Sequence, residues 1–215
     1  MSKVIVTGGA GFIGSHIVTD LSKKGHKVLV IDDLSGGTLS NLPFATRFND
    51  IDCREEHMVD VQFNRFKPDV VYHLAANAAE NKAQFSPVDV TSRNFGAFIN
   101  VLTSFIRHKG KRFVFFSSIA SYGALQTPFK ETDRPEPEDL YGISKYSSEM
   151  VLHVMSKVYG FEYVIVRPHN VYGEKQNMKD PYRNVVSLWL RAVQTGEPIN
   201  IYGDGEQKRQ FTYKC

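Results

Sequence analysis

The feature that most constrains the fold is a glycine-rich stretch, TGGAGFIG at 7–14, which directly follows an apolar run of β-forming residues. Gly8, Gly11 and Gly14 recur every three residues between a predicted strand and a predicted helix. Glycines at such a turn let the backbone bend sharply, let a diphosphate approach and let the helix pack close to the sheet. Amides at the helix N-terminus can then hold phosphates, so the turn predicts a dinucleotide site.

An acidic residue supports this interpretation. The β-rich run Lys27 to Ile31 ends at Asp32, so strand, glycine turn, helix and strand form one βαβ unit. A carboxylate in that place can accept hydrogen bonds from the adenosine ribose and repels a 2′-phosphate, which favours NAD over NADP. Two alternatives stay open, namely a glycine turn without a ligand and Asp32 as a solvated strand end.

Strands and helices are expected to alternate along the next hundred or so residues. The expected strands are 3–6, 27–31, 68–74, 112–117 and 163–167, and the expected helices are 12–24, 55–66, 87–108 and 140–159. This alternation predicts the α/β class, with a Rossmann-type doubly wound parallel sheet that is covered by helices on both faces. Ligands of such a sheet bind beyond the carboxyl ends of its strands.

The regular alternation stops after Arg167 and Pro168. We expect a loop at 173–182, a helix at 183–195 and a short strand at 198–202. The chain is therefore divided into a dinucleotide-binding Rossmann domain, residues 1–170, and a small, partial substrate lobe, residues 171–215.

Composition excludes several classes of partner. The net charge of +3 is small and no run of Lys or Arg is dense, so no nucleic-acid partner is expected. No apolar run is long enough to span a membrane and the N-terminus is not a signal peptide. Cys53 and Cys215 give neither a disulfide framework nor metal-ligand spacing, which favours a cytoplasmic location. His73 and His169 are interpreted as structural residues, and no metal is assigned.

A second group of residues has the pattern expected for proton transfer. Tyr141 and Lys145 open the helix expected at 140–159, and residues four apart lie on one helix face. A positive charge beside a phenol lowers the pKa of the phenol, so that a tyrosine can exchange a proton with a sugar hydroxyl near neutral pH. Ser118 follows the Phe-rich strand and would hydrogen-bond the same oxygen. The alternative is that Tyr141 only packs on the sheet.

Seven motifs run in one order over essentially the whole chain. They are TGGAGFIGSH at 7–16, IDDLSGG at 31–37, HLAA at 73–76, SSIASYG at 117–123, YGISK at 141–145, RPHNVYG at 167–173 and YGDGEQKRQFTY at 202–213. With them the chain resembles the NAD-dependent epimerase/dehydratase family, which are extended short-chain dehydrogenases that act on nucleotide sugars.

The resemblance implies a role for each matching residue. It implies that NAD is held by Gly8, Gly11, Phe12, Ile13, Gly14, Asp32, Asp33, Leu34, Ser35, Gly36, Asp52, Cys53, Leu74, Ala75, Ala76, Asn94, Tyr141, Lys145, Pro168 and His169. It implies a catalytic triad of Ser118, Tyr141 and Lys145. It implies that a nucleotide sugar, a UDP-hexose above all, is held by Ser118, Tyr141, Asn170, Asn184, Val185 and Arg209.

The residue two places after the triad serine bears on which reaction is expected. Family members that eliminate water or carbon dioxide carry an acid two places after the triad Ser or Thr, and this chain has Ala120 there. The resemblance therefore favours a 4-epimerase of the UDP-glucose/UDP-galactose type, which works through a transient 4-keto sugar. A catalytically silent NAD-binding fragment and a keto-sugar reductase are the alternatives.

The resemblance also bears on the end of the chain and on assembly. After the YGDG motif relatives have an acid after the arginine and then a long substrate lobe, whereas this chain has Gln210 and ends at Cys215. The resemblance therefore implies a truncated protein, a fragment or a member with a reduced lobe. The helices at 87–108 and 140–159 resemble the pair that forms a four-helix interface in relatives, so a homodimer is expected. The apolar residues of these two helices could instead cover this chain's own sheet.

Overall fold

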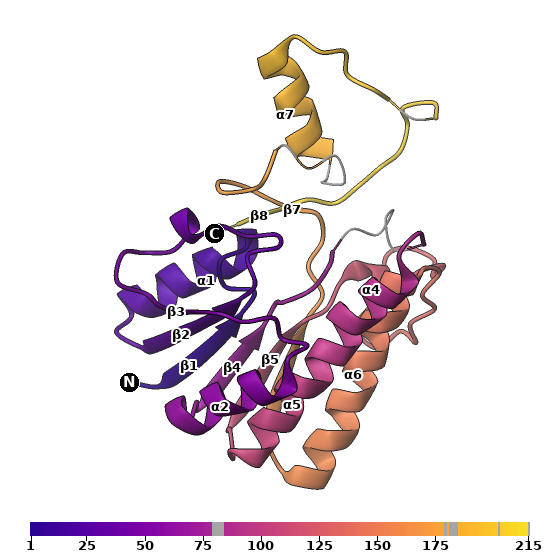
Figure 1. Ribbon diagram of the computed structural model, residues 1–215. Helices are drawn as coiled ribbons and strands as arrows, with labels where there is room; N and C mark the ends of the chain where they lie inside the picture. The colour runs from indigo at the N-terminus through magenta and orange to yellow at the C-terminus, as the bar shows by residue number, and fades with distance from the viewer. Residues whose placement is uncertain (79–83, 179, 181–184, 202, 215) are drawn as a thin grey trace.

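The computed structural model describes residues 1–78, 84–178, 180, 185–201 and 203–214. Its centre is a six-stranded parallel sheet in the order β3-β2-β1-β4-β5-β6 (Figure 1). The strands are β1 Lys3–Thr7, β2 Lys27–Asp32, β3 Arg47–Asp50, β4 Val70–His73, β5 Arg112–Phe116 and β6 Glu162–Val166. The strand order reverses between β1 and β4, and this reversal confirms the doubly wound Rossmann-type fold.

Helices pack on both faces of the sheet, because alternate residues of the strands point to opposite sides. Ile5 joins the larger apolar core beneath α2, α5 and α6, whereas Val4 and Val6 join a smaller core beneath α1. The helices are α1 Phe12–Lys23, α2 Glu56–Phe66, α4 Pro87–Thr91, α5 Ala97–Arg107 and α6 Leu140–Tyr159. Among the described residues, no helix is long and apolar enough to cross a membrane.

The helix expected at 87–108 contains an irregular turn. A single π-helical turn, η2 Ser92–Gly96, separates α4 from α5. Asn94 is buried in this turn, and its side chain both accepts from the backbone N–H of Asn77 at 2.7 Å and donates to the Asn77 carbonyl at 3.1 Å. π-turns of this kind are frequent at functional sites. The irregular turn thus fixes the segment that follows β4.

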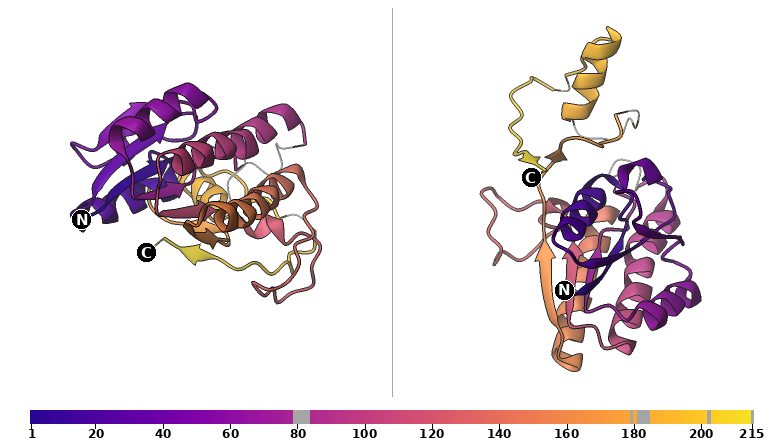
Figure 2. Two further views of the ribbon diagram at one scale, coloured as in Figure 1. Left: turned by 90° about the horizontal axis from the view of Figure 1, so that it is seen from below. Right: turned by 90° about the vertical axis from the view of Figure 1, so that its left-hand side faces the viewer.

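The C-terminal residues form a small lobe that projects from the end of the sheet (Figure 2). It contains β7 Val171–Tyr172, α7 Val185–Thr195 and β8 Thr212–Tyr213, and β7 pairs with β8 in parallel. The strand expected at 198–202 is wrong for residues 198–201, which are irregular, while residue 202 lies outside the described ranges. Ile199 and Ile201 are exposed and have no described strand beside them, so β-branched residues alone do not make a strand there. The division at residue 170 stays a prediction.

We predict that Gly14→Ala destabilises the fold. An added Cβ at Gly14 would lie 2.2 Å from the carbonyl oxygen of Gly8, whereas one at Gly36 would meet nothing within 4 Å. The variant should lower the free energy of unfolding by about 1–3 kcal/mol, since α1 has to move away from the turn. Urea denaturation followed by circular dichroism measures this. Gly36→Ala is the matched control, and equal stability of the two variants would contradict the prediction.

Candidate functional site

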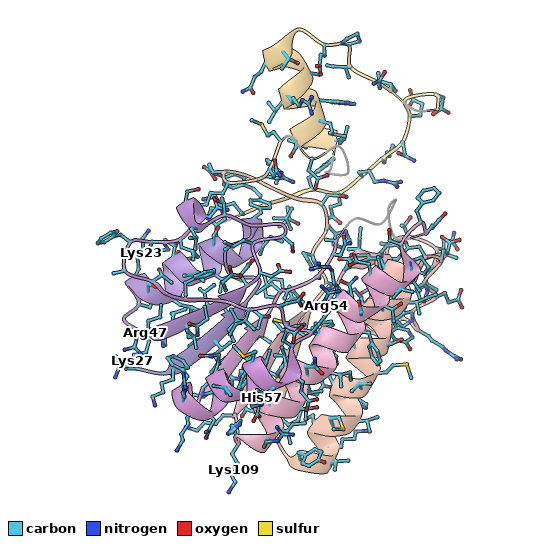
Figure 3. The ribbon with its side chains drawn as sticks, viewed as in Figure 1. Lys23, Lys27, Arg47, Arg54, His57 and Lys109 are labelled. Atoms are coloured by element: carbon cyan, nitrogen blue, oxygen red, sulfur yellow. The ribbon has the colours of Figure 1, made fainter. Side chains whose placement is uncertain are left out.

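A cleft of about 1020 Å³ opens at the carboxyl ends of the strands, where the strand order reverses. The glycine turn lines one side and the first turn of α6 lines the other. Figure 3 shows Arg54 near this edge of the sheet, while Lys109 extends from the opposite end of the molecule. The cleft therefore lies where parallel sheets of this type bind ligands.

The glycine turn has the shape that a diphosphate requires. Gly8 adopts a φ of +68° and an added Cβ would lie 2.6 Å from the amide nitrogen of Ala75, so only glycine fits there. Gly11 is the N-cap of α1 and contributes no capping side chain. The first amides of α1 are therefore directed at the cleft without a side chain in front of them, and can hold a phosphate.

Asp32 and Asp33 at the end of β2 have different partners. Asp32 accepts from the backbone N–H of Ala10 at 2.9 Å and of Leu34 at 2.8 Å, and burial raises the pKa of its carboxyl. The bond to Ala10 joins β2 to the glycine turn. Burial also opposes the charged form of Asp33, but hydrogen bonds from Ser35 and Arg93 outweigh it and lower the pKa of Asp33.

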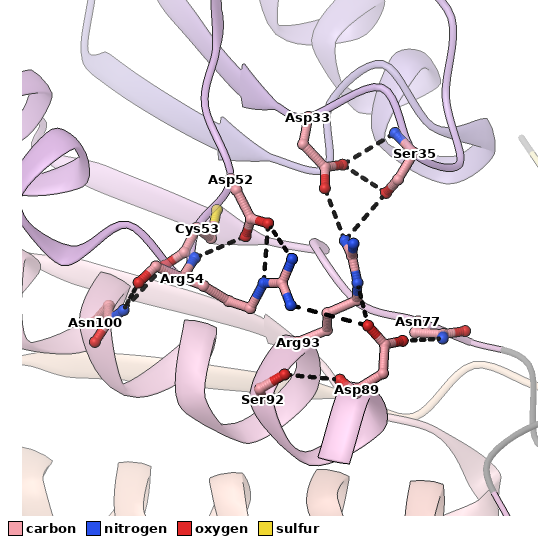
Figure 4. A network of polar contacts seen from close by, with 10 residues as sticks. All are labelled: Asp33, Ser35, Asp52, Cys53, Arg54, Asn77, Asp89, Ser92, Arg93 and Asn100. Atoms are coloured by element: carbon pink, nitrogen blue, oxygen red, sulfur yellow. Dashed lines mark hydrogen bonds and ion pairs between the residues drawn. The ribbon is translucent and has the colours of Figure 1, made fainter. Parts of the chain in front are cut away.

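A network of charged side chains lies at the end of the cleft that contains Asp32 and Asp33 (Figure 4). Arg93 binds Asp33 at 2.7 Å and Asp89 at 2.8 Å. Arg54 binds Asp52 at 2.6 Å, and its second terminal nitrogen lies 3.9 Å from Asp89. The network joins the loop after β2, the loop after β3 and the start of α4, and so holds three separate segments around the cleft.

Ser118, Tyr141 and Lys145 line the same cleft. Asp139 caps α6 by accepting from the amide of Gly142 at 2.7 Å, which fixes the turn that carries Tyr141. The Lys145 ammonium lies 5.8 Å from the centre of the Tyr141 ring and donates to the Phe116 carbonyl at 2.8 Å. Lys145 is 3% exposed, and burial lowers its pKa to about 8.

The buried carboxylate of Glu149 connects the strand end that precedes Ser118 with the helix that carries Tyr141 and Lys145. Glu149, one helical turn after Lys145, accepts hydrogen bonds from the Ser117 hydroxyl and from the Arg167 guanidinium. The exposed fraction of the side chain is 4% for Glu149 and 16% for Arg167. The hydrogen bond from Ser117, which precedes Ser118, holds the end of β5 against α6. The ion pair with Arg167 joins α6 to the segment after β6.

Most of the residues expected to hold a ligand line this one cleft. They are Gly8, Gly11, Phe12, Ile13, Gly14, Asp32, Asp33, Ser35, Gly36, Asp52, Cys53, Leu74, Ala75, Ala76, Ser118, Tyr141, Lys145 and Pro168. The described residues that do not line it are Leu34, Asn94, His169, Asn170, Val185 and Arg209. Asn184 lies outside the described residues. The individual roles stay predictions.

Further residues of the cleft wall were not expected from the sequence. They include Gly37, Thr38, Asn41, Asn77, Asp89, Arg93, Lys175 and Gln176. Gly37 could have been found, because it continues the glycine pair after β2 and an added Cβ there would lie 2.5 Å from the Ala10 backbone. The others come from loops and helix starts without a distinguishing pattern.

Comparison with known proteins agrees with this site. Residues 4–214 match the NAD dependent epimerase/dehydratase family. The chain belongs to this family. The cofactor of the family is NAD, and the glycine turn described above fits the diphosphate of a dinucleotide.

Individual relatives carry more specific names. A putative UDP-glucose 4-epimerase of Methanocaldococcus jannaschii is 35% identical, with 98% of this chain and 69% of the relative covered. A UDP-N-acetyl-alpha-D-glucosaminuronate decarboxylase of Bacillus cytotoxicus is 32% identical over 98% of this chain and 67% of the relative. The chain covers a smaller share, 63%, of a Halalkalibacterium halodurans UDP-glucose 4-epimerase.

Solved structures match the fold over nearly its whole length. The Thermotoga maritima UDP-glucose 4-epimerase with UDP-glucose has a TM-score of 0.94 and 35% identity, covering 99% of this chain and 69% of that protein. The Thermus thermophilus UDP-glucose 4-epimerase in complex with NAD has a TM-score of 0.92 and 33% identity, covering 99% and 70%. The relatives and structures described above are all named for UDP-sugars. Their names differ on the reaction, because one is a decarboxylase and the others are 4-epimerases.

We predict that Lys145→Met changes the pH dependence of stability. Below pH 8 folding buries an ammonium group, whereas between pH 8 and 10.5 the folded protein has lost this proton and the unfolded chain still holds it. Wild-type stability therefore gains up to about 3 kcal/mol over this range, and the variant lacks that gain. Thermal unfolding at pH 7 and pH 10 measures the difference. Lys23→Met, at an exposed lysine, is the control, and a pH-independent difference would contradict the prediction.

We also predict that Glu149→Gln is strongly destabilising, because it removes the buried carboxylate that is the charged partner of the partly buried Arg167 guanidinium. Loss of one member of a buried ion pair typically costs about 3–5 kcal/mol. Glu162→Gln breaks an exposed ion pair with Arg112 and should have little effect. Chemical denaturation of both variants gives the comparison, and similar losses in the two would show that burial of Glu149 is unimportant.

Proposed function

We propose that this protein is an NAD-dependent 4-epimerase of a nucleotide sugar. The observation that carries the proposal is the shared cleft, which is lined both by Tyr141 and Lys145 and by the glycine turn. A tyrosine with a neighbouring ammonium group is suited to move a proton to and from a sugar hydroxyl. The names of the Methanocaldococcus and Thermotoga relatives support UDP-glucose or UDP-galactose as the substrate.

In the proposed reaction Tyr141 removes the proton of the sugar 4-hydroxyl and later returns it. NAD, held at the glycine turn, would supply the acceptor for the hydride that leaves C4 of the sugar and the donor for its return. Lys145 favours the phenolate form of Tyr141 by its positive charge, and Ser118 orients the reacting hydroxyl. The resulting 4-keto sugar turns its other face to the cofactor before reduction, so one acid/base residue suffices for both half-reactions.

Ala120 favours epimerisation over elimination. This side chain packs against the small apolar cluster of Val90 and Tyr141, and it cannot accept or donate a proton. A dehydratase or decarboxylase needs a second acid or base beside the triad. One relative of this chain is named a decarboxylase, so the choice of epimerisation in this proposal depends on Ala120.

The C-terminal lobe is proposed to hold the nucleotide diphosphate. Asn170 donates to the carbonyl of Gln210 at 3.0 Å, which brings Asn170 next to Arg209. The guanidinium fork of Arg209 matches phosphate geometry. Val185 begins α7 in the same lobe, and Asn184 is included from the sequence alone.

A homodimer and a cytoplasmic location belong to the same proposal. Apolar side chains on α6 are exposed, namely Ile143, Met150, Val154 and Val158. Their spacing along one long helix suits a helical partner, and a second copy of α6 with α4 and α5 would complete a four-helix interface. The two separate cysteines support a reducing compartment.

A direct assay tests the proposal. We expect purified protein to contain NAD and to interconvert UDP-glucose and UDP-galactose without added reduced cofactor. Bound NAD with neither turnover nor UDP affinity would support a silent binding fragment, and stoichiometric consumption of NADH would support a reductase. Either result would overturn the epimerase.

Tyr141→Phe sharpens this test, because it removes only the hydroxyl. We expect the turnover rate to fall about 100-fold or more while NAD remains bound. Tyr146→Phe, at a neighbouring tyrosine of α6 outside the cleft lining, is the control and should retain activity. Retained activity in Tyr141→Phe would remove Tyr141 from the mechanism.

A further inference from the structure

Arg93 lies at the same end of the cleft as Asp32 and is held by two carboxylates. Its terminal nitrogen donates to Asp33 at 2.7 Å, its Nε donates to Asp89 at 2.8 Å, and the Ser35 hydroxyl lies 3.4 Å away. These partners come from the loop after β2 and from α4 (Figure 4). The guanidinium is therefore engaged on two of its edges by residues far apart in the sequence.

The neighbouring arginine is engaged in the same way. Arg54 donates from two nitrogens to Asp52, at 2.9 Å and 2.6 Å. Asp89 also accepts from the Asn77 amide at 3.0 Å. Among the residues that the structure describes, the carboxylates of this network together with Asp32 outnumber the guanidinium groups four to two, so these surroundings carry a net negative charge.

These contacts bear on which dinucleotide the cleft accepts. NADP differs from NAD by a 2′-phosphate on the adenosine ribose, and a guanidinium is the side chain that best matches phosphate geometry. Nη1 of Arg93 already donates to Asp33, so a grip on that phosphate through this nitrogen competes with Asp33. A phosphate that displaced Asp33 would leave an unpaired carboxylate beside a doubly charged anion. Like charges so close disfavour binding.

We propose that the Asp33–Arg93 ion pair determines cofactor choice, and that Arg93 is a latent 2′-phosphate-binding residue that Asp33 keeps occupied. Asp32 excludes the phosphate by its own charge, whereas Asp33 acts by occupying the cation that would otherwise attract it. This inference rests on the dinucleotide site of the proposed function and is independent of which sugar is turned over.

The test is a comparison of dissociation constants for NAD and NADP by isothermal titration calorimetry. Wild type should bind NAD more tightly than NADP. Asp33→Ser removes the carboxylate and makes room, so the ratio of the NADP to the NAD dissociation constant should fall at least tenfold. The double variant Asp33→Ser/Arg93→Gln should lose this gain, because the phosphate-binding group is gone.

Asp52→Ser is the matched control. It removes one carboxylate from the same network, but that carboxylate is a partner of Arg54 and not of Arg93. An equal fall of the ratio in Asp52→Ser would show that only net charge matters and would overturn the inference. A gain that persists without Arg93, or an unchanged ratio in Asp33→Ser, would also overturn it.

Asp33→Asn covers the case in which the serine variant does not fold. Asparagine retains the shape of Asp33 and its acceptor for Ser35 while losing the charge, so the ratio should move in the same direction by a smaller factor. Wild type that binds neither dinucleotide would overturn the proposed function as well, whereas bound NAD with an unmoved ratio would overturn this inference alone.

Discussion

The close approach of α1 to the first strands is the constraint on which the rest of the site depends. Gly14 lies against the Gly8 carbonyl at a distance that leaves no room for a side chain, and Gly8 needs a backbone conformation that glycine tolerates best. This packing directs the first amides of α1 at the cleft. The hydrogen bond from the Ala10 amide to Asp32 then fixes the turn to β2, so the glycine turn and the Asp32 carboxylate are positioned by one local interaction.

The reversal of strand order places the chemistry opposite that turn. β1 and β4 are neighbours, so the segments after β4 and β5 open onto the same cleft as the glycine turn. Lys145 reaches this cleft from α6 with its ammonium against the Phe116 carbonyl and the Phe115 ring. A buried ammonium is tolerated only with partners, and here those partners are the end of β5 and the Tyr141 ring. Tyr141 is also the residue that moves the proton in the proposed reaction.

Local patterns in the sequence predict the βαβ units and the glycine turn well, because each depends on residues close together in the chain. The structure brings Ser118, Tyr141 and Lys145 to one cleft, while their roles as a triad stay a prediction. β3 was not predicted, since Arg47–Asp50 is short, polar and at the sheet edge, where β-propensity gives little signal. The π-turn in the helix expected at 87–108 arises from a contact of Asn94 with Asn77 across a loop. The ion pair of Arg93 with Asp33 joins residues 60 positions apart, and a repeating pattern in the sequence cannot predict a contact at that separation.

Glu149 explains how the catalytic residues and the C-terminal lobe can keep a common geometry. Its carboxylate accepts from Ser117, which precedes Ser118, and from Arg167, which precedes Pro168 and the segment that leads into β7. The Arg167 guanidinium also stacks on the Tyr122 ring at 4.5 Å. A displacement of the segment after β6 therefore disturbs a buried ion pair that also orients the triad strand, and this cost favours a lobe that is fixed at its root. The substrate contacts that we propose for the lobe would then keep a fixed position relative to Tyr141, although the chain between them is largely irregular.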